Sequence, residues 1–259
     1  MIRPRVIPCL LLRNRGLVKT VQFNDPTYLG DPINIVRIFN DKEVDELVVL
    51  DITATVENRK PPFKLLSEIA SECFMPLGYG GGVRDLQDIR TILGLGIEKV
   101  VINSYAVENP AFVRAAADLY GSQSIVVSID VRRNRRGRQE VVTQCGNRWT
   151  GLDPVRLAAD MQHAGAGELL LNSIDRDGTM RGYDIELISQ VAGALGIPVV
   201  VCGGARTIND LVSAVRDGGA SAAAAGSMFV FQGPLRAVLI SFPTPDELKL
   251  AFSGGQIHG

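Results

Sequence analysis

Three aspartates stand where short apolar runs end, and carboxylates are side chains that readily exchange protons with a substrate. Asp130 follows the run SIVVSI, Asp51 follows VVL, and Asp177 comes soon after LLLNS. If the runs are parallel strands of one barrel, these carboxylates share its C-terminal mouth. One such aspartate is equally well explained as a turn or helix-capping residue, but three favour an acid–base site with Asp130 as the catalytic candidate.

Glycines and small polar residues follow four of the apolar runs in a pattern that occurs twice. Backbone N–H groups at helix starts attract anions, and glycine lets an anion approach closely. Either copy alone could simply make tight turns. The duplication favours two phosphate sites across one barrel mouth, and hence an elongated bisphosphate ligand. The residues are Gly82, Asn103 and Ser104 in the first copy and Gly203, Gly204, Gly226 and Ser227 in the second.

A second charged set lies where apolar runs begin. Arg5, Glu46, Lys99 and Glu168 each precede or open such a run. Charges at these positions can simply face solvent. If they point inward, two cations and two anions can close the N-terminal end of a barrel as a neutral ring.

Other kinds of chemistry find little support. The two histidines are His163, in a helical pattern, and His258, so a Ser–His or Cys–His nucleophile and a His-rich metal site are not expected. Four cysteines lack CxxC spacing, which argues against zinc and disulfides and fits a reducing cytoplasm. No GxGxxG fingerprint with a following ribose-binding acid occurs. We therefore expect no cofactor and no metal.

The overall composition indicates a soluble protein without a nucleic-acid or membrane partner. The formal net charge is −1, so no general basic field is present. The apolar run at the N-terminus is too short for a signal peptide, and no run approaches the roughly 20 residues that span a bilayer. The basic segment 132–138 could contact a substrate phosphate, contact a partner or be a solvated loop.

The elements that must position these residues alternate along the chain. Continuous β-branched runs are typical of strands covered on both faces, and amphipathic segments between them indicate helices. Strict alternation over 259 residues predicts a (β/α)8 TIM barrel, with an open doubly wound sheet as the structural alternative. Strands are expected at 6–11, 46–51, 75–79, 99–103, 124–130, 168–172, 198–202 and 222–226, and helices at 32–44, 62–73, 86–95, 110–119, 153–164, 185–195, 208–217 and 234–240.

An internal repeat supports closure of the barrel. Segment 76–104 resembles 198–227 in its order of strand, glycine pair, arginine, helix and strand. One domain is therefore expected over 1–259, with half-barrels at about 1–120 and 121–240 and a tail at 241–259. Long connections at 12–31 and 131–151 would lie at the active-site face, and the second has the pattern of a basic hairpin.

Motifs along nearly the whole chain resemble the cyclase subunit family of imidazole glycerol phosphate synthase. They are IPCL (7–10), LVKT (17–20), GDP (30–32), DELVVLDIT (45–53), GGGV (80–83), EKVVINS (98–104), GSQSIVVSID (121–130), TG (150–151), GAGELLLNSIDRDGT (165–179), GYD (182–184) and CGGA (202–205). The resemblance implies a partner glutaminase that docks at the N-terminal face and releases ammonia there. It assigns an ammonia gate to Arg5, Glu46, Lys99 and Glu168. It assigns phosphate or substrate contacts to Lys19, Asp51, Gly82, Asn103, Ser104, Asp177, Gly178, Gly203, Gly204, Gly226 and Ser227.

The sequence departs from the family at one catalytic position. The family uses two aspartates, and Asp130 matches one, but Leu11 stands in place of the other. Further differences, including Gly78–Tyr79 before the glycines, are expected on the substrate face, whereas the gate positions are intact. This asymmetry resembles the divergent branch linked to acetamidino-sugar synthesis for surface polysaccharide, in which the barrel supplies ammonia to an N-acetyl sugar amidotransferase.

Two other functions stay open at this point. One is a working cyclase of histidine biosynthesis, with Asp130 acting alone or with a substitute acid such as Asp51. The other is a non-catalytic scaffold that activates a glutaminase. Intact phosphate positions argue against a pure scaffold.

Overall fold

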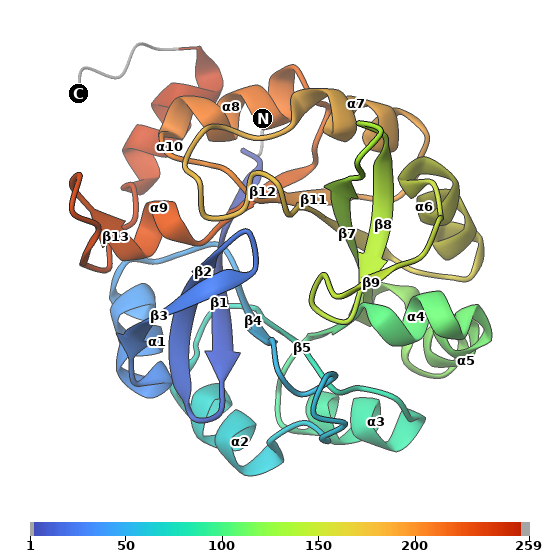
Figure 1. Ribbon diagram of the computed structural model, residues 1–259. Helices are drawn as coiled ribbons and strands as arrows, with labels where there is room; N and C mark the ends of the chain where they lie inside the picture. The colour runs from blue at the N-terminus through green and yellow to red at the C-terminus, as the bar shows by residue number, and fades with distance from the viewer. Residues whose placement is uncertain (1–2, 255–259) are drawn as a thin grey trace.

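The chain folds as a closed (β/α)8 barrel in a computed structural model that describes residues 3–254 (Figure 1). The parallel barrel strands are β1 (Arg5–Arg13), β4 (Leu47–Asp51), β5 (Leu77–Gly80), β6 (Lys99–Ile102), β7 (Ile125–Arg133), β10 (Glu168–Ser173), β11 (Val199–Cys202) and β12 (Ala222–Ala225). Pairing of β10 with β7 closes the circle, with Asn172 beside Asp130. The predicted barrel is confirmed, and the open sheet is excluded.

Helices cover the outside of the barrel and begin at recognisable caps. The side chains of Asp31, Asp85, Asp153 and Asp184 each accept a hydrogen bond from a backbone N–H group in the first helical turn that follows. The helices are α1 (Pro32–Asp41), α2 (Phe63–Glu72), α3 (Leu86–Gly94), α5 (Pro110–Tyr120), α6 (Pro154–His163), α7 (Ile185–Gly193), α8 (Ile208–Arg216) and α10 (Pro245–Ser253), with short α4 (Ser104–Glu108), α9 (Ser227–Val230) and the 3₁₀ turn η1 (Ser122–Ser124). No helix within residues 3–254 is long and apolar enough to cross a membrane.

Alternation along each strand separates two apolar layers. In β1, Val6, Leu10 and Leu12 belong to the layer between strands and helices. Ile7, Cys9 and Leu11 belong to the separate cluster inside the barrel. The four alanines of β12 are all buried, which confirms the strand that its composition alone favoured least.

The two halves of the barrel begin alike. Both β1 and β7 run past the barrel rim and pair antiparallel with a following strand, β2 (Gly16–Val21) in the first half and β8 (Gln139–Thr143) in the second. β3 (Asn24–Gly30) and β9 (Arg148–Trp149) extend these hairpins. The basic segment therefore forms a hairpin as predicted. The long first connection is also a hairpin, and it folds over the barrel mouth (Figure 1).

The helix predicted at 234–240 is wrong. Gly233 and Arg236 both have positive φ, so the chain turns there and forms a small hairpin of β13 (Phe231–Gln232) and β14 (Ala237–Val238). The last helix of the barrel is α10, which lies in the segment predicted as a tail. It packs beside α8, and Arg216 of α8 donates a 2.9 Å hydrogen bond to the carbonyl oxygen of Phe252.

The packing of α10 predicts that it contributes to barrel stability. Leu248 is fully buried, whereas Leu250 of the same helix is 46% exposed. Leu248→Ala should lower the free energy of unfolding by about 2–4 kcal/mol, because it leaves a cavity under the helix. Leu250→Ala should change it by less than about 0.5 kcal/mol. Chemical denaturation of both variants measures this, and equal small effects would show that α10 is not part of the cooperative fold.

Candidate active site at the C-terminal mouth of the barrel

A cavity of about 480 Å³ opens at the C-terminal ends of the strands. Both halves of the barrel contribute equivalent residues to its wall. Cys9, Leu11 and Arg13 of β1 line it, and so do Ser128, Asp130 and Arg132 of β7, each 119 positions later. The half-barrel repeat therefore places Leu11 and Asp130 as counterparts in one pocket.

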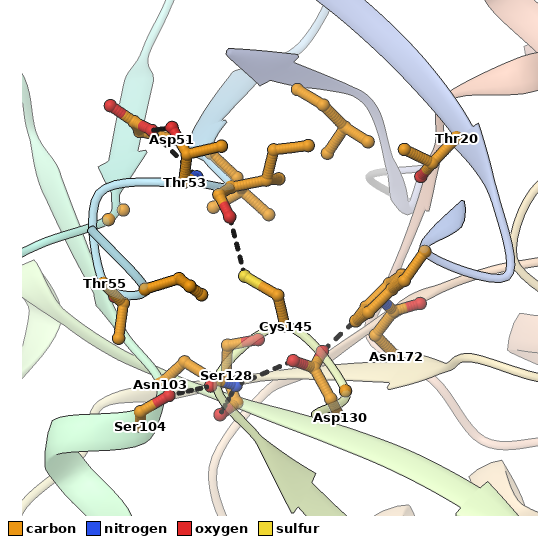
Figure 2. Close-up of a pocket in the computed structure, with 18 of the residues that line it drawn as sticks. Thr20, Asp51, Thr53, Thr55, Asn103, Ser104, Ser128, Asp130, Cys145 and Asn172 are labelled. Atoms are coloured by element: carbon orange, nitrogen blue, oxygen red, sulfur yellow. Dashed lines mark hydrogen bonds between the residues drawn. The ribbon is translucent and has the colours of Figure 1, made fainter. Parts of the chain in front are cut away.

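Asp130 is a buried acid of this pocket without a cationic partner. Asn103 donates a 3.1 Å hydrogen bond from Nδ2 to Oδ2 of Asp130, and Asn172 approaches Oδ1 at 3.4 Å (Figure 2). Burial raises the pKa of Asp130 to about 7, with Asp177 adding to the rise and the two amides opposing it. The carboxyl group can therefore gain or lose a proton near neutral pH, as general acid–base chemistry requires.

Leu11 cannot share that role. Its side chain lines the cavity, as the alternation from Cys9 predicted, and it has no titratable group. Asp51, named above as a substitute acid, is occupied elsewhere. Its Oδ1 accepts hydrogen bonds from the N–H groups of Thr53 and Ala54, and Arg59 lies 3.3 Å from its Oδ2. Asp51 thus holds the loop after β4 in shape, and this contradicts its role as a free acid.

The first predicted phosphate set lies at the cavity. Gly80, Gly81, Gly82, Asn103 and Ser104 all line it. Gly82 has φ of +72°, and a Cβ there would lie 2.4 Å from the carbonyl oxygen of Arg59, so only glycine fits. The hydroxyl of Ser104 accepts a 2.9 Å hydrogen bond from the N–H of Gln144, which ties the hairpin of the second half to this set.

The second predicted set is partly covered. Lys19, Asp177 and Gly226 line the cavity, whereas Gly178, Gly203, Gly204 and Ser227 stand behind them and do not. Lys19 is 4% exposed, and its Nζ lies 2.9 and 3.0 Å from the two carboxylate oxygens of Asp177. The first hairpin is closed over Gly178, because a Cβ there would lie 2.3 Å from the carbonyl oxygen of Thr20.

Two lining groups were not singled out from the sequence. Asn172 of β10 pairs with Asp130 of β7, and both were the last residues of their predicted strands, which was the available signal. Cys145 points into the cavity from the turn between β8 and β9, and its thiol donates a 2.7 Å hydrogen bond to the carbonyl oxygen of Ile52 (Figure 2). Burial raises the pKa of this thiol to about 12, so it is a poor nucleophile.

Unsatisfied polar atoms in the wall indicate a ligand site. Thr20 Oγ1 and Asn172 Oδ1 are buried and have no hydrogen-bond partner within residues 3–254. Both residues line the cavity. Buried polar groups are nearly always paired in native proteins, so a bound ligand or water completes them. The described residues contain no group of three or more His, Cys, Asp and Glu side chains placed to hold a metal ion.

The four charges at the other end of the barrel form a closed ring. Arg5 donates hydrogen bonds to Glu46 and to Glu168. Lys99 lies 2.9 Å from both oxygens of Glu46 and 2.6 Å from Glu168 Oε2. The side chains point inward, so the solvent-facing interpretation is wrong. Two cations and two anions compensate each other, which makes their burial tolerable.

One of the residues at which this sequence departs from the family pattern lies elsewhere than predicted. Gly78 was expected on the substrate face, but it pairs with Lys99 across β5 and β6, at the level of the charged ring. A Cβ on Gly78 would lie 3.6 Å from Cβ of Lys99. Tyr79 points outward into the helix layer and donates from its hydroxyl to the carbonyl oxygen of Gly81 at 3.0 Å.

The fold and this site define a class of protein: a two-fold repeated (β/α)8 barrel with a buried acid and small-residue loops at the pocket and a charged ring at the opposite end. A family model described as "Histidine biosynthesis protein" matches residues 5–235. The chain therefore belongs to this family, as a cyclase-like subunit of the imidazole glycerol phosphate synthase type.

Curated relatives cover almost the whole chain. A Pseudomonas aeruginosa protein named "Putative imidazole glycerol phosphate synthase subunit hisF2" is 50% identical over 96% of this chain and 100% of its own length. A Leptospira borgpetersenii protein named as subunit HisF of the same synthase is 46% identical over 97% and 100%. A Vibrio vulnificus protein named as subunit hisF3 is 44% identical over 97% of each. The family resemblance read from the motifs is confirmed.

The burial of Asp130 predicts a pH dependence of stability. Since its pKa in the folded protein is raised, the folded state holds a proton that the unfolded state loses between about pH 4 and 7, and stability falls as pH rises through that window. Asp130→Asn has no titrating group at this position, so its stability should not fall in this way as pH rises. The variant should gain up to about 4 kcal/mol in free energy of unfolding relative to the parent between pH 4.5 and 8. Denaturation across pH measures it.

The matched control is Asp118→Asn, at an exposed position of α5. It removes the same charge without removing a buried group. A difference between parent and Asp130→Asn that stays constant with pH would contradict the raised pKa.

Because the charges of the ring balance, we predict that removal of one anion lowers the free energy of unfolding. Glu46→Gln leaves two half-buried cations facing one carboxylate and should lower the free energy of unfolding by about 3 kcal/mol. Glu72→Gln, which breaks an exposed pair with Arg37, should cost less than about 1 kcal/mol. If both variants unfold at the same denaturant concentration, the ring is not a buried charge network.

Proposed function

We propose that this chain is an ammonia-channelling subunit of a glutamine amidotransferase complex, with weak or absent cyclase activity. The observation that carries the proposal is the asymmetry between the two ends of the barrel. The charged ring of Arg5, Glu46, Lys99 and Glu168 is complete, whereas Leu11 lines the pocket in the position equivalent to Asp130. The N-terminal end of the barrel thus keeps all four charges of the family's ammonia gate. The C-terminal pocket has leucine in place of one of the family's two catalytic aspartates.

The interior between the two ends suits ammonia. Above the ring it is lined mainly by apolar side chains, among them Ile7, Val48, Val101, Val126 and Leu170. An apolar passage disfavours the ammonium ion, because burial of an unpaired charge is expensive, and admits neutral ammonia. A glutaminase that releases ammonia would dock at the N-terminal face, and Lys99 and its partners would have to separate to let ammonia through.

In the pocket, Asp130 is the one group suited to move a proton. A cyclase of this family pairs two carboxylates, one to donate and one to accept. With leucine at position 11, one of these steps lacks its group, which costs on the order of 10²–10⁴ in rate. A phosphorylated ligand would bind along the mouth between the Gly82–Asn103–Ser104 set and the Asp177–Gly226 set.

We further propose that the ammonia serves an N-acetyl sugar amidotransferase that forms an acetamidino sugar for surface polysaccharide, in the cytoplasm. Support comes from the sequence resemblance to that divergent branch and from the replaced catalytic residue. A barrel that no longer cyclises its own substrate has use for an intact ammonia route only if another acceptor exists.

A working cyclase is the second candidate, and two observations favour it. The pKa of Asp130 is about 7, which suits one residue acting as both donor and acceptor in turn. The buried unpaired atoms of Thr20 and Asn172 point to a ligand. The same atoms count against a scaffold that binds nothing.

An ammonia-dependent cyclase assay separates these functions. The purified protein is given the bisphosphate aminoimidazole substrate of histidine biosynthesis and ammonium salt at high pH, beside Leu11→Asp. We expect no turnover by the parent and a gain of about 100-fold or more over the detection limit in Leu11→Asp, because the second carboxylate is restored. The control is Asp130→Asn in the Leu11→Asp background, which should lose the gain. Parent turnover near about one per second would overturn the proposal.

A further inference from the structure

The small hairpin β13–β14 contributes a cation to the barrel mouth. The hairpin is largely exposed, and Leu235 at its turn is 92% exposed. Arg236 is the exception in the turn: it is half-buried and folds back onto the barrel. This hairpin stands where a helix was predicted, so no site residue was expected in it.

Arg236 reaches the second phosphate set that the pocket wall conceals. Its Nη1 donates a 3.0 Å hydrogen bond to the carbonyl oxygen of Gly178, and its Nη2 lies 3.4 Å from Oγ of Ser227. Gly178 follows β10 and Ser227 follows β12. The guanidinium thus bridges a loop that the family resemblance assigns to the ligand and a loop of the second glycine copy. Both residues adjoin cavity-lining neighbours, Asp177 and Gly226.

The charge of Arg236 is not compensated. Lys19, a further cation beside this set, is neutralised by Asp177. Arg236 has no carboxylate within ion-pair distance in the described part of the chain. Its two contacts are to neutral oxygen atoms, and a guanidinium has five N–H donors, so three are left over.

The hairpin holds this arginine in a fixed place. Its guanidinium carbon lies 4.6 Å from the centre of the Phe231 ring, a cation–π contact. Its backbone has φ of +52°, a conformation unusual for a residue with a side chain. An arginine held by a ring and by two acceptors is preorganised to bind a further anion with its free donors.

We propose that Arg236 is an anion-binding residue of the second phosphate site, supplied by the β13–β14 hairpin and specific for a phosphate monoester group of the ligand. The inference rests on the phosphorylated ligand of the proposed function. It adds a side-chain cation to a site that the glycine loops alone would form from backbone N–H groups.

Binding of inorganic phosphate, followed by ³¹P NMR titration, tests the proposal on the full-length protein. Arg236→Gln keeps much of the side-chain length and removes the charge, and should weaken phosphate binding at one of two sites by about 10-fold or more. Arg236→Lys keeps the charge but loses the two-pronged donor geometry of the guanidinium. Its phosphate affinity should lie between those of the parent and Arg236→Gln. Asn103→Ala should weaken the other site. Arg90→Gln, on an exposed arginine of α3, removes the same charge away from the barrel mouth and should change binding less than 2-fold.

The outcomes separate this inference from the proposed function. If Arg236→Gln binds like the parent while Asn103→Ala does not, Arg236 only fastens the hairpin and the inference is overturned, with the phosphate ligand retained. If the parent takes up no phosphate, both the inference and the phosphorylated ligand fail, whereas the proposed loss of cyclase activity is tested separately by the assay of Leu11→Asp beside the parent. Near-identical melting temperatures of parent and Arg236→Gln exclude loss of the hairpin as the cause of weaker binding.

Discussion

Closure of the barrel by pairing of β7 with β10 is the constraint on which the other features depend. A closed parallel barrel buries every strand on both faces, so each inward side chain must find a partner inside a narrow cylinder. Glu168 at the start of β10 can meet Lys99 and Arg5 only because the ends of the sheet are joined. At the other end the same pairing puts Asn172 beside Asp130. The gate-like ring and the acid are thus two layers of one closed structure.

The layers differ in how charge is tolerated. At the bottom, opposite charges neutralise each other in pairs. At the C-terminal end, Lys19 forms an ion pair with Asp177, and Arg59 forms one with Asp51. Asp130 instead accepts hydrogen bonds from the side-chain amides of Asn103 and Asn172. A carboxyl group without a cation in a buried pocket is driven toward its protonated form. The structure therefore places an acid whose pKa is raised to about 7 where a ligand would lie.

Much of this could be predicted from the sequence, because burial leaves a local pattern. Continuous apolar runs gave the strands, and their ends gave Asp130, Gly82, Asn103 and the four ring charges. Contacts that depend on how the loops cross the barrel mouth have no such local pattern in the sequence. Lys19 meets Asp177 across 158 positions of chain, and Arg59, Cys145 and Arg236 reach the site from turns with no periodicity. The error at 234–240 has a related cause: an apolar run was read as a helix although Gly233 and Arg236 adopt left-handed backbone.

Leucine at position 11 leaves Asp130 without a carboxylate counterpart. The half-barrel repeat makes Leu11 and Asp130 counterparts at one pocket. Burial is the largest cause of the raised pKa of Asp130. Near neutral pH the group is then part protonated, so it can donate or accept one proton but cannot do both in a single step. A reaction that needs concerted donation and acceptance of protons is then slowed. Under the proposed function, passage of ammonia through the barrel would need no proton transfer at this position, so the substitution would affect cyclisation and delivery unequally.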